Sequence, residues 1–224
     1  MILSKTKLIL AVTLVSLCGC KQVSADYAEE YCDDFEARAR ADDAHAQVEL
    51  ANCYIVGKGR EIDYPTAEEW LQRAVILGDS KAPIALASLI LFKLNDESRY
   101  EVAISLLQGA DRKLVHQSAF LLGVAYRNGM GIKEDKLESQ RLFVVAAKNG
   151  HVLSKFVVFG IHALDRNALN DGLDIDYWRR QFEEALPSIR IISSDEFVEK
   201  ARDDPLILNY IFSTAELDRI SERL

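Results

Sequence analysis

The chain has 224 residues, of which 49% are hydrophobic, and it contains only 11 glycines and 4 prolines. Such a composition excludes a disordered chain and predicts a folded, mostly helical protein. The formal net charge of −8 and the lack of a basic stripe argue against nucleic acid as a ligand. An acidic balance is typical of a soluble surface, and it also fits a basic protein partner.

The first residues are arranged like a bacterial signal peptide. Lysines at positions 5 and 7 precede an apolar run over 8–17. As a helix, this run is too short to cross the ~30 Å hydrocarbon core of a bilayer. We therefore expect a cleaved targeting segment rather than a membrane-spanning helix.

The motif Leu17-Cys18-Gly19-Cys20 resembles the lipobox of bacterial lipoproteins, except that Cys18 stands where alanine or serine is commoner. The resemblance implies a lipoprotein signal peptide over 1–19 and lipid on Cys20, which several acyl chains would anchor stably. Lys21 stands where an aspartate would retain such a protein in the inner membrane, so the expected location is the outer membrane, facing the periplasm. An ordinary secretory signal that is cut elsewhere is the alternative.

Two further cysteines, Cys32 and Cys53, remain for the folded part of the chain. An even pair in an oxidising compartment predicts a disulfide. Closing the loop between them would contribute roughly 3 kcal/mol on the chain-entropy estimate. Two buried free thiols are the alternative.

Residues 20–26 are predicted to be a tether, and residues 27–43 an N-terminal capping helix. Within the latter, the aromatic residues Tyr31 and Phe35 and then Ala39 are spaced four apart, which places them on one helical face. This segment is in register with the second helix of the repeating unit that follows, so we expect a half-unit that covers the first edge of a stack.

Residues 44–151 repeat with a constant period. Leu50, Leu86 and Leu122 are in register, and the matching small residues include Ala74, Ala110 and Ala146. A constant period of small and apolar positions is typical of a solenoid, in which each unit buries its face by stacking on the next. The predicted units are 44–79, 80–115 and 116–151.

Each unit is predicted to be a pair of helices. In the first unit, apolar residues at the spacing of one helical face indicate a helix over about 44–56 that ends at Gly57. Asp63 and Pro65 then provide the N-cap and the first-turn proline of a second helix. The middle unit keeps the apolar positions but lacks the turn glycines, so its turn is expected to be irregular.

Two of these units resemble the Sel1-like repeat, a relative of the tetratricopeptide repeat with a slightly longer turn. The matching strings are AQVELANCYIVGKGREIDYPTAEEWLQRAVILGD and SAFLLGVAYRNGMGIKEDKLESQRLFVVAAKNGH. The resemblance implies an all-α fold, a right-handed α-α superhelix (solenoid) of helix pairs. It also implies a binding role, as an adaptor, inhibitor or assembly factor for other proteins.

The last third of the chain departs from the pattern. Residues 152–187 are predicted to be a degraded fourth unit, because Trp178 lies three periods after Trp70. Residues 188–224 are predicted to be a helical cap. Its two short helices would begin at the capping-box pairs Ser193 with Glu196 and Ser213 with Glu216. The apolar stretch 205–213 between them either covers the last edge of the stack or docks a partner.

No catalytic constellation stands out, so the chain is predicted not to be an enzyme and to need no cofactor or metal. Gly57-Lys58-Gly59 lacks the Walker spacing of a phosphate-binding loop and follows a helix, so it is interpreted as a turn. The four histidines have no metal-ligand spacing, and no GxSxG elbow is present. A hydrolase built from carboxylates distant in sequence is the alternative.

Candidate partner-binding residues are those that form one helical stripe on the first helices yet differ between units. The positions that agree are required for packing, whereas these can face a concave surface. For Leu121 and Val124, packing between neighbouring units is an equal alternative. The stripe comprises His45, Glu49, Asn52, Lys81, Ser88, Phe92, Gln117, Leu121, Val124 and Asn128.

These observations predict a lipid-anchored, periplasm-facing module that binds another protein. By resemblance to small repeat lipoproteins, we expect an inhibitor or immunity protein with an acidic concave surface that neutralises an envelope-acting toxin, such as a secreted phospholipase effector. A scaffold or adaptor for envelope assembly or signalling is the first alternative. A cell-wall or β-lactam hydrolase is the second, although its cysteine-rich relatives would require a disulfide in each repeat.

Overall fold

The computed structural model describes residues 25–94, 96–165, 174–186 and 211–223. The predicted signal peptide, Cys20, most of the predicted tether and the pair Ser193 with Glu196 lie outside the described residues. The described residues form ten α-helices and two short 3₁₀ helices, with no strand among them. The helices are α2 (Ala25–Arg40), α3 (Ala44–Val56), α4 (Tyr64–Ile76), α5 (Ala82–Phe92), η1 (Glu97–Arg99), α6 (Tyr100–Gln108), η2 (Arg112–Leu114), α7 (Val115–Asn128), α8 (Lys136–Lys148), α9 (Val152–Leu164), α10 (Ile175–Glu183) and α12 (Thr214–Ser221).

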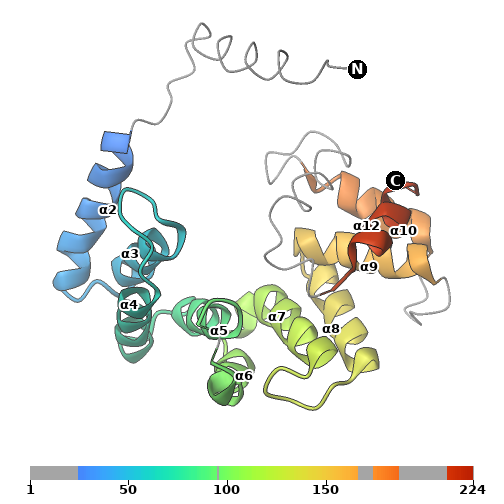
Figure 1. Cartoon of the computed structure of the whole chain (residues 1–224), viewed down its shortest axis with the longest axis horizontal. Helices are drawn as coiled ribbons and strands as arrows, with labels where there is room; N and C mark the ends of the chain where they lie inside the picture. Colours follow the sequence, from blue (N-terminus) through green and yellow to red (C-terminus); the bar gives the residue numbers. More distant parts are fainter. Residues whose placement is uncertain (1–24, 95, 166–173, 187–210, 224) are drawn as a thin grey trace, which may run out of the picture.

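The helices are stacked as antiparallel pairs along an arc (Figure 1). Helices α3 and α4 form the first pair, α5 and α6 the second, α7 and α8 the third, and α9 and α10 the fourth. In the first two pairs, the second helix lies on the outer side of the arc. The prediction of an all-α solenoid is therefore confirmed. None of the described helices is both long enough and apolar enough to cross a membrane.

The first and third pairs close their turns in the same way. In the first, the Asp63 backbone N–H donates to the Tyr54 carbonyl oxygen at 3.0 Å; in the third, Asp135 donates to Tyr126 at 2.9 Å. Gly57 ends α3 in the left-handed conformation, with φ of 70°, a conformation that glycine adopts without steric cost. The turn geometry is thus the same in these two units, at positions two sequence periods apart.

The middle pair has a different turn, as expected from its missing glycines. Helix α5 ends at Lys93 with φ of −127°, and Asp96 then caps the 3₁₀ helix η1. Arg99 of η1 forms an ion pair with Glu68 of α4, including a 3.0 Å bond from Nη1 to Oε2. This bond lowers the pKa of Glu68. The ion pair therefore connects the irregular turn of the middle pair to the first pair.

The main hydrophobic core of the described residues runs from α3 to α12. Trp178 of the fourth pair is 1% exposed and packs in this core, as do Ile211 and Phe212. Burial of each such large side chain contributes about 1.5–3 kcal/mol. For the part of the stretch 205–213 that the structure describes, Ile211 and Phe212 therefore cover the end of the stack. The capping box of Ser213 and Glu216 begins α12 as predicted.

Helix α2 packs on α3 at the other end of the arc. A disulfide joins Cys32 of α2 to Cys53 of α3, with their Cα atoms 6.3 Å apart. Arg60 reaches back to Asp33 and Glu36 of α2 at 3.2 and 3.3 Å. The small cluster of Ala39, Ala46 and Leu50 fills the interface. Helix α2 is thus held by one covalent bond, one ion-pair network and a small apolar contact.

Candidate binding groove

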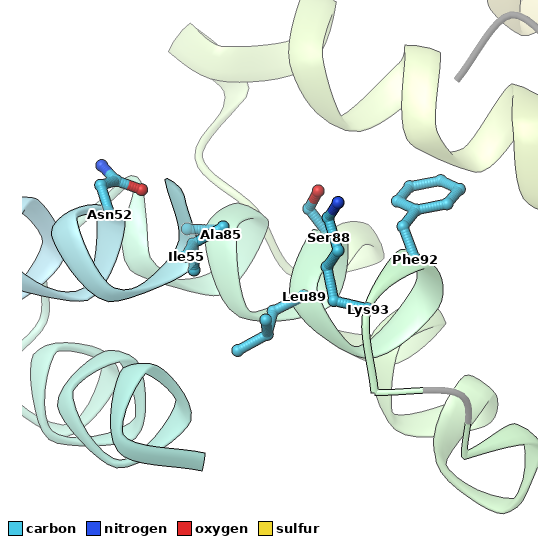
Figure 2. Close-up of a pocket in the computed structure, with 7 residues that line it drawn as sticks. All are labelled: Asn52, Ile55, Ala85, Ser88, Leu89, Phe92 and Lys93. Atoms are coloured by element: carbon cyan, nitrogen blue, oxygen red, sulfur yellow. The ribbon is translucent and has the colours of Figure 1, made fainter. Parts of the chain in front are cut away.

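Two adjoining cavities form a groove along the first helices of the pairs. The larger has a volume of about 400 Å³ and is lined by residues of α3, α5, α7 and the start of α9. The smaller, of about 210 Å³, lies against α3 and α5 (Figure 2). Asn52, Ala85 and Ser88 line both cavities, so the two are continuous. We call them together the groove.

The structure brings most of the predicted stripe together in this groove. The residues of the stripe that line it are Glu49, Asn52, Lys81, Ser88, Phe92, Gln117 and Leu121. They come from three successive first helices, where a period of one repeat puts equivalent side chains side by side.

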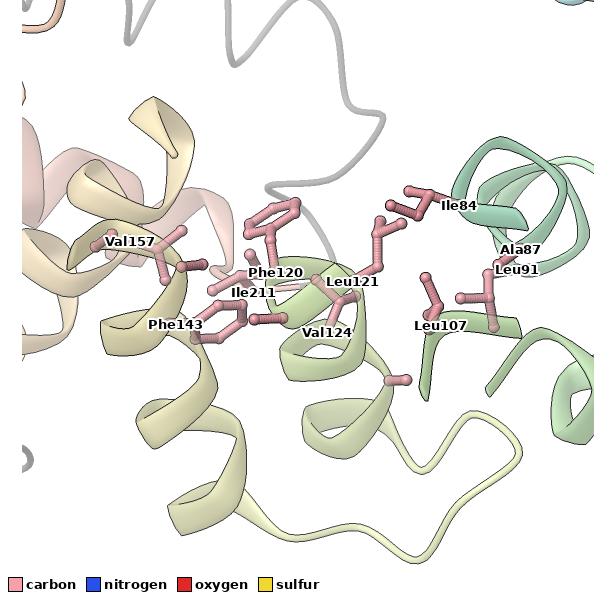
Figure 3. Close-up of a cluster of buried hydrophobic side chains, with 14 of the residues drawn as sticks. Ile84, Ala87, Leu91, Leu107, Phe120, Leu121, Val124, Phe143, Val157 and Ile211 are labelled. Carbon is pink, nitrogen blue, oxygen red and sulfur yellow. The ribbon is translucent and has the colours of Figure 1, made fainter. Parts of the chain in front are cut away.

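Three residues of the stripe do not line the groove. Val124 is fully buried among core side chains of neighbouring helices (Figure 3), so it packs between units and is unavailable to a partner. Asn128 is exposed at the end of α7, where its side-chain amide donates to the Val124 carbonyl oxygen at 2.8 Å. His45 is exposed at the start of α3, outside both cavities.

Leu121 combines both of the roles that the sequence left open. It is only 6% exposed and belongs to the core, and it also lines the larger cavity. In Figure 3 its side chain points toward Ile84 of α5, which lines the same cavity. The floor of the groove is therefore formed by side chains of the hydrophobic core. A partner would contact Leu121 without displacing it.

Several lining residues were missed by the sequence reasoning. Leu153, on α9, lies one period after Gln117 and two after Lys81, so extending the stripe into the fourth unit would have found it. Val48, Ile84 and Phe120 are equally one period apart and apolar. Packing alone would explain such a pattern, so nothing in the sequence indicated that they also line a groove. Lys93 gave no periodic signal, because glycine occupies its place in the first and third units.

His151 forms part of the groove wall at the start of α9. Its Nδ1 accepts a hydrogen bond from the Ser154 backbone N–H at 3.2 Å and caps the helix. Its ring lies 4.5 Å, centroid to centroid, from the ring of Phe120. Burial, with a smaller contribution from the charge of His116, lowers the pKa of His151 to about 4. The imidazole is therefore neutral at pH 7, as its acceptor role requires.

The groove is not acidic, contrary to the expectation for the concave surface. Its charged lining residues are Lys81, Lys93 and Glu49. The excess of acidic residues in the chain therefore does not lie in the lining of the groove. Within the described part of the chain, no three His, Cys, Asp or Glu side chains gather closely enough to hold a metal ion.

Comparison with known proteins supports the fold. The Sel1 repeat family model matches residues 44–79 and 116–151, which are the first and third predicted units. The Sel1-repeat-containing protein YjcO of Escherichia coli K12 is 34% identical over 113 residues, covering 49% of this chain and 46% of YjcO. YjcO of E. coli O157:H7 gives the same figures. The chain thus spans about half the length of the curated relatives it matches.

Two solved structures share the arrangement of helices at low sequence identity. The Sel1 repeat protein from Oxalobacter formigenes has a TM-score of 0.59 at 19% identity, covering 69% of this chain and 62% of its own. The protective antigen c5321 of uropathogenic E. coli has a TM-score of 0.55 at 19% identity, covering 88% and 42%. At this identity the likeness concerns the fold alone.

Proposed function

Because this chain is a Sel1-like repeat protein, we propose that it binds a protein partner in the groove along its first helices. Proteins of this fold are generally binding modules. The observation that supports the site is that seven side chains that vary between units line one continuous groove. The positions that agree between units are buried in the core or partly buried against it. Variation on a constant framework is what a binding surface on a solenoid requires.

The partner that we propose is an envelope-acting toxin, such as a secreted phospholipase effector, and the chain is its inhibitor or immunity protein. The support is the lipobox-like motif at Cys20, which would hold the groove on the periplasmic side of the outer membrane, and the disulfide, which fits an oxidising compartment. An inhibitor gains from being anchored where the toxin acts, because anchoring raises its effective concentration.

Affinity capture with soluble residues 21–224, washed at high salt and followed by mass spectrometry, tests this proposal. One stoichiometric hydrolase that is inactive while bound is the expected result. Several resident envelope proteins in sub-stoichiometric amounts would instead favour a scaffold. A chain that retains no partner but hydrolyses cell-wall or β-lactam substrates would overturn the binding proposal.

A matched pair of variants locates the binding surface. Ser88→Trp should fill the groove and abolish capture, because Ser88 lines both cavities. Ser105→Trp makes the same change on α6, the second helix of the same pair, where Ser105 is exposed. Retention of the partner by the Ser105 variant and its loss by the Ser88 variant would place binding in the groove. Equal loss in both would rule the groove out.

A further inference from the structure

The smaller cavity has the chemistry of a socket for one side chain. Ile55 of α3 and Leu89 and Phe92 of α5 give it apolar walls, and Asn52, Ser88 and Lys93 provide polar atoms (Figure 2). Its volume of about 210 Å³ is below the roughly 300–1,000 Å³ typical of small-molecule sites. A partner's apolar anchor side chain fits such a space, and anchors of this kind dominate the energy of protein interfaces.

Lys93 supplies a cation that only the middle unit has at this position. In the first and third units the equivalent residues are Gly57 and Gly129, which carry no side chain and have φ of 70° and 66°. In the middle unit the turn is rebuilt with φ of −127°, which allows a lysine there. The irregular turn of this unit therefore places an ammonium group at the socket.

The groove lysines are available for a partner. Among the described residues, no carboxylate lies within 4.0 Å of the ammonium group of Lys81 or Lys93, whereas Arg38, Arg60 and Arg99 are all paired with carboxylates. Glu49 lines the larger cavity and not the smaller. The socket is thus a positively charged, mainly apolar site on a chain whose net charge is −8.

Building on the proposed protein-binding function, we propose that the smaller cavity receives a large apolar side chain of the partner and that Lys93 pairs with an aspartate or glutamate beside it. The apolar walls select the anchor, and the ammonium group of Lys93 selects the acidic neighbour and disfavours a basic one. The segment of the partner that docks here is therefore acidic and apolar, rather than basic as the net charge alone would suggest.

A displayed library of random dodecapeptides, selected on soluble residues 21–224, tests the inference. We expect the enriched peptides to carry a large apolar residue within two positions of an acidic one. Lys93→Glu should weaken their binding by about tenfold or more, and replacing the acidic residue of the peptide by lysine should restore binding to this variant. Lys93→Met keeps the size of the side chain, and it should lose affinity without gaining preference for the lysine peptide.

Lys113→Glu is the matched control, because Lys113 is exposed in η2, outside both cavities. This variant should bind the peptides as the unaltered chain does. The inference would be overturned if the enriched peptides were basic, if they shared no motif, or if Lys93→Glu bound them with unchanged affinity. The proposed function has a separate test. If the Lys93→Glu variant still captures the partner, the inference about the socket is wrong and the proposed function stands. If the unaltered chain captures no partner, the proposed function itself is wrong.

Discussion

At the scale of single residues, Gly131 shows how closely the third unit approaches the second. A Cβ atom at Gly131 would meet the backbone of Tyr100 and lie 2.7 Å from the Glu101 nitrogen. The residue also has φ of +66°. Both the conformation and the space therefore require glycine, and the turn after α7 is fitted against the start of α6.

Gly131→Ala should lower the free energy of unfolding by about 3 kcal/mol or more, because backbone atoms cannot move aside cheaply. Gly150→Ala is the matched control: Gly150 has φ of +94°, and a Cβ there would meet nothing within 4 Å. It should cost only about 1–2 kcal/mol. Urea unfolding measures both. Equal losses would show that conformation alone, and not the contact between units, makes glycine necessary.

His151, the N-cap of α9, makes the free energy of unfolding depend on pH. Its pKa is about 4 in the folded protein and 6.5 in a free side chain, so the unfolded state binds the proton first as the pH falls. The contribution of this group is present above pH 6.5 and is lost progressively down to pH 4. The total change is on the order of 3 kcal/mol.

The variant His151→Asn isolates this effect, because asparagine can still cap α9 but does not titrate. The difference in unfolding free energy between the unaltered chain and the variant should fall as the pH is lowered from 6.5 to 4. The other histidines and the carboxylates are common to both proteins and cancel. A difference that stays constant over this range would mean that His151 keeps an ordinary pKa.

At the scale of elements, helix α2 depends on its disulfide. Its apolar contact with α3 is small, with Ala39 and Cys32 as its fully buried side chains among residues 31–40. The double variant Cys32→Ala, Cys53→Ala should lose roughly 3 kcal/mol of stability. The loss should be concentrated in α2, whose amide protons should exchange much faster while those of α8 stay protected. Uniform acceleration in both helices would show that α2 and the rest unfold together.

The sequence predicted the helices well and the groove partly, for physical reasons. The helix pairs follow from a regular period of apolar residues, and Asp63 caps α4 through the Thr66 N–H as predicted. A stripe on one helix, however, does not reveal which of its members a neighbouring helix covers. Val124 was therefore included although it is buried, and Leu153 was omitted although it lines the cavity.

Lys93 could not be predicted by any search for repetition. Its position in the groove results from the turn of the middle unit, which differs from the turns of the neighbouring units. A search for residues that match between units passes over a position where they differ. The charge of the groove was misjudged for a similar reason. Net charge is a property of the whole surface, whereas the lining residues number only a few and include two lysines.

At the scale of the whole molecule, the groove is lined by the first helices of four pairs. We expect its charged side chains to act on binding and not on folding. Charge reversal at Glu49 or Lys81 should weaken binding of the captured partner by about 5- to 30-fold, which is roughly 1–2 kcal/mol for a charge at the rim of an interface. The melting temperature should not fall, because neither side chain has an ion-pair partner among the described residues. Calorimetric titration and thermal unfolding measure the two quantities. A lowered melting temperature would show that these residues stabilise the stack.

The disulfide between α2 and α3 also has a mechanical consequence. If Cys20 carries lipid as proposed, any pull between the membrane and a bound partner enters the folded chain through α2. Helix α2 alone would peel away under such a load, since its apolar contact with α3 is small. The covalent bond at Cys32 passes the tension directly to Cys53, in the last turn of α3, so the load bypasses the small apolar contact between α2 and α3.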